Sequence, residues 1–433
     1  MDYPKDAPKG DPPQPLPPRF DPPEASKEPV ADEVSVFYGT DRRPLGPAAA
    51  ADAGDSSSLR TAAQAACLAL AGIASLVAVV TGRATLRAAL LATAVLGVVG
   101  CVSARMWLGK RREIPAVADG KPIGYGPDRG EVRYGLCRVT IPRDHRLGVL
   151  ESPSIFRLEF ATDPARHVGL ADVAEYPVDK FHARLRASLD EHQKARGKRQ
   201  LLVFIHGFNN SFEYAARRTA QLAYDLEYEG VAMFWSWPSQ GQIASYAHDE
   251  NNVRWTEPHL ERFLREVSAR SGAETIHLIA HSMGNRCLTE ALRRLSTGAG
   301  IPAAVREVVL TAPDIDAETF AEDVAPAIVG PGHRVTLYAS SRDRALASSK
   351  ELHGGPRLGE SGNGIVIIPP LETIDVSAVD TSFLGHAYFG DNTSVISDLY
   401  YVLRGHPTSK RDGIVPKAHF GKAYWAFQPL VVP

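Results

Sequence analysis

One short segment, residues 275–286 (TIHLIAHSMGNR), limits what this chain can fold into more than any other. Residues 276–280 are an apolar run that predicts a buried strand, and residues 285–296 carry apolar side chains at helical spacing. Ser282 lies between them in an A-x-S-x-G sequence, with Ala280 in place of the more common first Gly. The pattern predicts a nucleophile elbow, a strained strand–turn–helix connection that presents a Ser hydroxyl. An ordinary strand–helix loop is the alternative.

Strands and helices alternate on both sides of this segment. The other expected strands are residues 131–141, 154–160, 200–205, 231–235, 305–311, 334–339 and 364–368. The expected helices are residues 178–196, 211–228, 258–271, 317–328 and 394–404. Such alternation is typical of βαβ crossovers. The sequence therefore predicts an α/β fold with a mostly parallel central sheet flanked by helices.

Composition argues against several classes of protein. Hydrophobic residues make up 44% of the 433 residues, which is ample for a large core. The formal net charge of −2 and the absence of a basic stripe argue against nucleic-acid binding. The cysteines, which form no C-x-x-C pair, are Cys67, Cys101, Cys137 and Cys287. This usage is typical of a reducing compartment and gives no zinc motif, so we expect neither metal nor cofactor.

The first 60 residues divide into three parts. Residues 1–32 are rich in Pro and charged residues and have too few apolar residues to bury, so we expect a disordered tail. Residues 33–42 contain an alternating segment, residues 34–38, that predicts a strand. Residues 43–60 are mostly small and predict a linker. No apolar segment of the signal-peptide type follows a basic start.

Residues 61–109 are expected to form a transmembrane helical hairpin. Residues 61–82 carry no charge over about 20 positions, the length that spans a bilayer, and residues 88–104 form a second apolar stretch. Lys and Arg are more frequent on the outer flanks than in the short connection, which places both flanks in the cytoplasm. We therefore expect a two-span anchor in the inner membrane. A buried hairpin of a soluble protein is the alternative.

The Ser at the elbow requires a base, and the base requires an orienting acid. Both should follow Ser282, because in this architecture the chain order is Ser, acid, His. His386, in a loop beyond the expected strands, is the candidate base. The other histidines that follow the Ser are His333, His353, His406 and His419.

The candidate acid is Asp343, in the loop after the expected strand at residues 334–339. That is the second strand after the elbow, where this architecture usually supplies its acid. Asp314 and Asp316 follow the preceding strand and are the alternatives. All three also fit a purely structural role, because an Asp ahead of a helix is a common N-cap.

An oxyanion hole should complete the site. One donor is expected to be the Met283 N–H, directly after the nucleophile, and the other the Phe208 N–H in the HGFN sequence. Gly207 permits a tight turn there. His206, Gly207 and Trp237 are candidates for the substrate pocket, with buried packing as the alternative for the aromatic ring.

Several strings resemble those of the α/β-hydrolase superfamily, and more closely a bacterial esterase/lipase-like group of largely unassigned function. The matching strings are residues 36–42, 141–148, 204–209, 236–239, 280–285 and 385–388. The resemblance implies an α/β-hydrolase catalytic domain over residues 113–433, joined by the strand in residues 33–42, and a Ser282–Asp343–His386 hydrolase. If that strand joins the body, both flanks of the hairpin share one compartment, which requires an even number of crossings.

We therefore expect a membrane-anchored serine hydrolase that cleaves carboxylic esters, with lipids and thioesters among the candidate substrates. A non-catalytic membrane scaffold on the same fold is one alternative, because fold alone does not fix function. An acyltransferase that uses the same triad is another. The sequence indicates neither the acyl chain length nor the oligomeric state.

Overall fold

The computed structural model describes residues 30–45, 124–153, 159, 161–241, 245–379 and 393–428. The expected membrane hairpin at residues 61–109 lies outside these ranges, as do His386 and almost all of the expected tail. Across the described ranges, no helix combines the length and apolar character needed to cross a membrane. The hairpin therefore stays a prediction.

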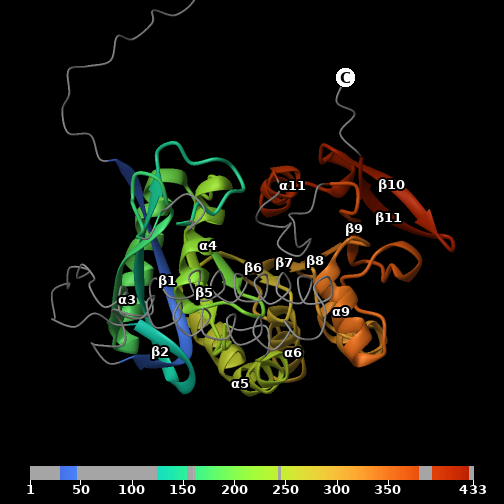
Figure 1. The fold of residues 1–433 in the computed structure, drawn as a ribbon, viewed down its shortest axis with the longest axis horizontal. Helices are drawn as coiled ribbons and strands as arrows, with labels where there is room; N and C mark the ends of the chain where they lie inside the picture. The colour runs from blue at the N-terminus through green and yellow to red at the C-terminus, as the bar shows by residue number, and fades with distance from the viewer. Residues whose placement is uncertain are drawn as a thin grey trace, which may run out of the picture.

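The described residues form an 11-stranded sheet that runs through the molecule (Figure 1). Its strands, in spatial order, are β10 (Ile414–His419), β11 (Lys422–Phe427), β9 (Glu372–Asp375), β8 (Arg334–Ala339), β7 (Val305–Thr311), β6 (Thr275–His281), β4 (Gln200–Ile205), β5 (Val231–Ser236), β1 (Ala31–Leu45), β2 (Gly124–Pro142) and β3 (Gly169–Tyr176). The strands from β11 to β1 pair in parallel, whereas β2 runs antiparallel to its two neighbours and β10 runs antiparallel to β11. The predicted mostly parallel sheet is confirmed.

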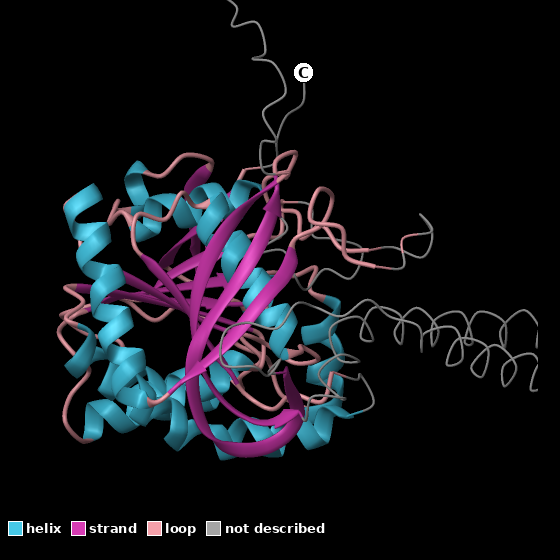
Figure 2. Cartoon of the chain, turned by 90° about the vertical axis from the view of Figure 1, so that its left-hand side faces the viewer, coloured by secondary structure: helices cyan, strands magenta, loops and turns pink. Residues whose placement is uncertain are grey.

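Helices cover both faces of the sheet (Figure 2). One face packs against α3 (Val178–Arg196), α5 (Tyr246–Ser271), α6 (Gly284–Thr297) and α8 (Ala325–Ile328), and the other against α4 (Phe212–Asp225) and α11 (Thr393–Leu403). Neighbouring strand residues such as Val203 and Phe204 point into opposite cores. Because both faces are buried, the central strands are largely apolar, which allowed them to be predicted from the sequence.

Some expected elements differ from the structure, among them one helix and one strand. The helix expected from Pro258 begins earlier, at Tyr246. The sequence did not indicate its first half, because that half buries polar side chains such as Asp249 and Asn252, which interrupt the apolar helical spacing. The strand expected at residues 364–368 is wrong. Its apolar side chains are largely buried without strand pairing, and the adjacent strand is β9 instead.

β1 is longer than predicted and lies inside the sheet. It pairs in parallel with β5, from Val36 opposite Ala232 to Thr40 opposite Ser236. It also pairs antiparallel with β2 along its whole length, ending with Leu45 opposite Gly124. The strand therefore includes residues 31–32 of the expected tail and residues 43–45 of the expected linker. Both ends of the undescribed segment 46–123 consequently belong to one folded body.

Candidate active site

The turn between β6 and α6 has the strained backbone of a nucleophile elbow. Ser282 has φ 52°, in the left-handed region that non-glycine residues rarely adopt. Two other residues in this region, Asn209 after β4 and Ala312 after β7, lie at the same edge of the sheet, with φ 60° and 45°. Such outliers persist where the surrounding structure holds them, and they gather at functional sites.

Hydrogen bonds hold the elbow from beneath. The Ser282 N–H donates to Thr311 O at 3.0 Å, and the Asn285 amide Nδ2 donates to Ser282 O at 2.9 Å. Gly284 is required because a Cβ there would lie 2.3 Å from His206 O. Ala280, by contrast, is fully buried in the core beneath the sheet, which accommodates the methyl group that replaces the usual glycine.

The loop after β4, residues 206–210, lies directly against the nucleophile. A Cβ on Gly207 would stand 2.8 Å from the Cβ of Ser282, so only glycine allows this approach. Within the described part of the chain, the N–H groups of Phe208 and Met283 donate to no other protein group. Two such amides beside a Ser are suited to bind an oxyanion, as predicted for these two residues.

His206 and Trp237 are both fully buried, and their contacts favour a supporting role over the predicted lining of a substrate pocket. The rings stack at 5.1 Å between centroids, and the Trp237 indole N–H donates to His206 O at 2.7 Å. His206 Nδ1 donates to Gly207 O at 2.8 Å, which leaves Nε2 as an acceptor. Burial, and secondly the nearby charge of Arg42, lower the pKa of His206 to about 3. The neutral ring therefore holds the loop from behind.

The close approach at Gly207 yields a first prediction. Gly207→Ala should lower the rate at which Ser282 reacts with an electrophilic probe about 10- to 100-fold, because misplacing a reacting group by roughly 1 Å costs up to about 100-fold. The rate is measured by labelling with a fluorophosphonate. Gly330→Ala is the matched control, because a Cβ at Gly330 meets no atom within 4 Å. Equal rates for the two variants would contradict the proposed contact.

The three candidate acids have different surroundings. Asp314 is buried and its carboxylate already accepts from four side chains. Oδ1 accepts from Ser349 Oγ at 2.6 Å and Arg357 Nε at 2.9 Å. Oδ2 accepts from Arg286 Nη2 at 3.1 Å and from the hydroxyl of Tyr246. This saturation leaves no room for a histidine and disfavours Asp314 as the acid.

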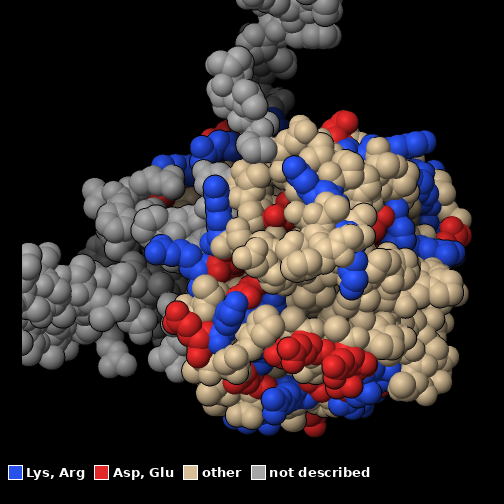
Figure 3. All heavy atoms as spheres, turned by 90° about the vertical axis from the view of Figure 1, so that its right-hand side faces the viewer, with Lys and Arg blue, Asp and Glu red and all other residues tan. Residues whose placement is uncertain are grey.

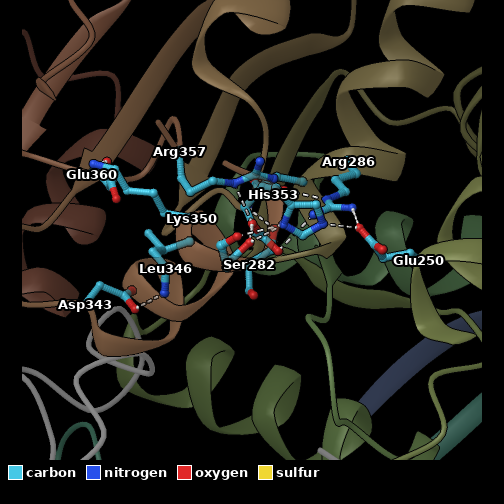
Figure 4. Close-up of polar contacts among 12 residues, drawn as sticks. Glu250, Ser282, Arg286, Asp343, Leu346, Lys350, His353, Arg357 and Glu360 are labelled. Atoms are coloured by element: carbon cyan, nitrogen blue, oxygen red, sulfur yellow. Dashed lines mark hydrogen bonds and ion pairs between the residues drawn. The ribbon is translucent and has the colours of Figure 1, made fainter. Parts of the chain in front are cut away.

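Asp316 and Asp343 are both N-caps. Asp316 is partly exposed and caps α7 (Ala317–Thr319) by accepting from Thr319 N at 2.9 Å. Asp343 is 4% exposed and caps α9 (Arg344–His353), where its Oδ1 accepts from Ala345 N and Leu346 N, each at 3.0 Å (Figure 4). The cap does not exclude catalysis, because a carboxylate has a second oxygen.

His386 lies outside the described residues, so its role as the base stays a prediction. Val376 and Ser377, which precede it in the chain, lie beside the Asp343 loop. Val376 N donates to Ala339 O at 2.9 Å, and Ser341 N donates to Ser377 Oγ at 2.8 Å. The segment that leads to His386 therefore leaves the sheet at the same edge as the elbow.

The other downstream histidines have their own partners or lie elsewhere. His333 bonds to Ile328 O at 2.7 Å. His353 bonds to Glu250 Oε1 through Nε2, at 2.8 Å, and to Ser349 (Figure 4). His406 packs edge-on against Tyr401, beyond α11, and His419 lies on the edge strand β10. These surroundings favour His386.

No role for Tyr246 was predicted from the sequence. Tyr246 lies at the start of α5, where its ring packs edge-on against Phe208 at 5.2 Å between centroids. Its hydroxyl contacts Asp314 and accepts from Arg286 Nη2 at 3.0 Å. The ring therefore braces the oxyanion loop from the α5 side. No local pattern indicated this, because the helix itself was predicted to start later.

One family model accords with this architecture. A family model described as "Alpha/beta hydrolase of unknown function (DUF900)" matches residues 182–402. No curated protein matches the chain. The carboxylesterase CesB from Bacillus subtilis shares 11% identity over 52% of this chain and 99% of its own, with a TM-score of 0.28. A fungal esterase from Rhizomucor miehei shares 12% identity over 64% and 80%, with a TM-score of 0.26. Scores this low mark only a loose likeness.

Proposed function

Because the chain belongs to this α/β-hydrolase family of unknown function, we propose that it is a serine hydrolase that cleaves carboxylic esters. The observation that carries the proposal is the strained Ser282 at the end of β6, with Gly207 packed against it and two amides nearby without protein acceptors in the described part of the chain. This arrangement suits attack by a Ser on a carbonyl carbon.

The proposed reaction proceeds through an acyl-enzyme. Ser282 Oγ attacks the acyl carbon while His386 accepts its proton, and Asp343 orients the imidazolium. The N–H groups of Phe208 and Met283 bind the oxyanion. When the tetrahedral intermediate collapses, His386 gives the proton to the departing alcohol. Water then attacks the acyl-enzyme with His386 again as the base, which releases the acid and restores Ser282.

We further propose that residues 61–109 anchor the enzyme to a membrane with two spans, the catalytic domain facing the cytoplasm. The pairing of β1 with β5 and β2 supports an even number of crossings, because the sequence on both sides of the segment joins one sheet. On the face shown in Figure 3, the described acidic and basic side chains are interspersed, without a continuous basic stripe. That distribution does not favour binding of nucleic acid through this face.

A fluorophosphonate probe tests the proposed nucleophile. The full chain in detergent should be labelled, mass spectrometry should place the adduct on Ser282, and Ser282→Ala should reduce labelling to background. Ser271→Ala is the matched control, because Ser271 is another buried Ser but lies at the end of α5, ahead of the amino end of β6. Labelling of Ser282→Ala at the wild-type rate would refute the proposal.

A further inference from the structure

Arg42 is a buried cation that contacts both the loop that carries the Phe208 N–H and the loop after β5. It is 1% exposed, although it is an arginine at the end of a strand that leads to the surface. Burial lowers its pKa to about 10, against the opposing charges of Asp249 and Asp41, so the side chain stays charged at neutral pH. A buried charge is costly unless its donors are satisfied, which makes its partners informative.

The guanidinium of Arg42 joins the oxyanion loop, residues 206–210, to the loop after β5, residues 236–240. On the oxyanion loop, Nη2 donates to Asn210 O at 2.7 Å and faces His206 Nε2 at 3.4 Å. On the other loop, Nε donates to Ser236 Oγ at 2.8 Å and Nη1 donates to Ser239 O at 3.1 Å. One planar group thus fixes the distance between the loops.

Asp249 completes the connection from α5. Its carboxylate accepts from Ser239 Oγ at 2.5 Å and from Gln240 N at 2.8 Å. Asp249 is itself fully buried and interacts electrostatically with Arg42. The pair therefore offers a local balance of charge, and the whole network lies behind the loop that carries the Phe208 N–H.

The sheet places Arg42 there. Thr40 lies opposite Ser236 in the parallel pairing of β1 with β5, so Arg42 stands just beyond the carboxyl end of β5. Gly207, against which Ser282 packs, is the neighbour of His206. The chain of contacts thus runs from Arg42 through His206 to the loop that touches the nucleophile.

We propose that Arg42 is a positioning residue that holds the oxyanion loop in register with Ser282. The inference rests on the proposed hydrolase function for its catalytic consequence, whereas the positioning itself can be measured without any reaction. A Lys cannot replace Arg42 fully, because an ammonium lacks the planar fork that reaches both loops at once.

The experiment compares Arg42→Met, Arg42→Lys and Arg217→Met in the full chain in detergent. Arg217 is a matched control: it is another largely buried arginine, donating to Val168 O at 2.7 Å and Ser152 Oγ at 2.6 Å, away from both loops. Hydrogen–deuterium exchange of the peptide that covers residues 207–210 reports loop position. The rate of fluorophosphonate labelling and the kcat and KM for a p-nitrophenyl ester report its consequence.

In Arg42→Met we expect faster exchange at residues 207–210 and a labelling rate lowered about 100-fold, the range for loss of an oxyanion donor. kcat should fall in parallel while KM changes less than about twofold, because the lost contacts act on the transition state. Arg42→Lys should recover part of the rate. Arg217→Met should match wild type in all readouts.

Unchanged exchange at residues 207–210 in folded Arg42→Met would overturn the inference, whatever the activity. So would an equal loss of labelling in Arg217→Met, which would indicate a general effect on the fold. If Arg42→Met does not fold, the same exchange measurement on Arg42→Lys and Ser236→Ala tests the positioning role. Ser236→Ala removes one acceptor of the guanidinium. If wild type reacts with no probe, the hydrolase proposal fails while the exchange result still decides on positioning.

Discussion

Asp343→Asn is expected to lower kcat about 1,000- to 10,000-fold without unfolding the protein, if Asp343 orients the catalytic histidine. The amide removes the negative charge that stabilises the imidazolium. It keeps an oxygen that can accept from Ala345 N and Leu346 N, and Asn caps helices about as well as Asp. Activity and stability should therefore separate, as measured by ester hydrolysis and by urea unfolding.

Asp316→Asn is the matched control for this substitution. Asp316 is also the N-cap of a helix that follows a parallel strand, and it also accepts from a backbone N–H, that of Thr319. Its replacement should leave kcat within about twofold of wild type, because surface substitutions of this kind have small effects. A large loss of activity in Asp316→Asn with none in Asp343→Asn would reassign the acid.

The sequence indicated the edge of the sheet at which the site forms, but it could not choose the acid. β4, β7 and β8 begin and end where predicted, because strands buried on both faces are largely apolar, with their charged side chains near the amino ends. Asp314 and Asp343 each follow such a strand and precede a helix, so their local patterns are alike. Only tertiary contacts distinguish them, and those depend on Arg286 and Arg357, which lie far from either strand in the chain.

Contacts between residues far apart in the chain also explain what the sequence did not predict. Arg42 precedes the expected hairpin, and nothing near it in the chain indicates that it contacts Asn210 and Ser239. Trp237 was a candidate for the substrate pocket with buried packing as the alternative, and the buried alternative is the one observed, because a local string does not show which side of a loop a ring will occupy. The deciding information for Arg42 is the pairing of β1 with β5, and for Trp237 it is the pairing of β4 with β5, which brings Trp237 to His206.

Asp314→Asn should lower the free energy of unfolding by about 3–5 kcal/mol, the usual cost of removing one partner of a buried ion pair. Asp314 and Arg357 are both 3% exposed, and Arg357 Nε lies 2.9 Å from the carboxylate. Arg286, which also bonds to Glu250 at 2.5 Å, loses only one of two acidic partners. The asparagine leaves the buried Arg357 with the charge of the partly exposed Asp316 in place of a directly bonded carboxylate. Urea unfolding followed by tryptophan fluorescence measures the loss.

The pH dependence gives this prediction a second, independent check. Burial raises the pKa of Asp314, but the charges of Arg286 and Arg357 outweigh it, and the net shift is downward. A lowered carboxyl pKa contributes stability above the unfolded value, about 3.9, and the contribution disappears as the pH falls through the folded value. The difference in unfolding free energy between wild type and Asp314→Asn should therefore be constant from about pH 5 to 8 and narrow below about pH 4.

Asp323 lies at an exposed position in the same connection between β7 and β8. Asp323→Asn should have the same free energy of unfolding as wild type at every pH. If the difference in unfolding free energy between wild type and Asp314→Asn stayed constant down to pH 2, the ion-pair explanation would be contradicted. The folded fraction of Asp314→Asn should still react with a fluorophosphonate, because the Asp314 carboxylate bonds to Arg286, Arg357, Ser349 and Tyr246 and so supports the fold around the elbow. Loss of stability with retained labelling in Asp314→Asn, and the reverse in Asp343→Asn, would together assign one carboxylate to the fold and the other to the reaction.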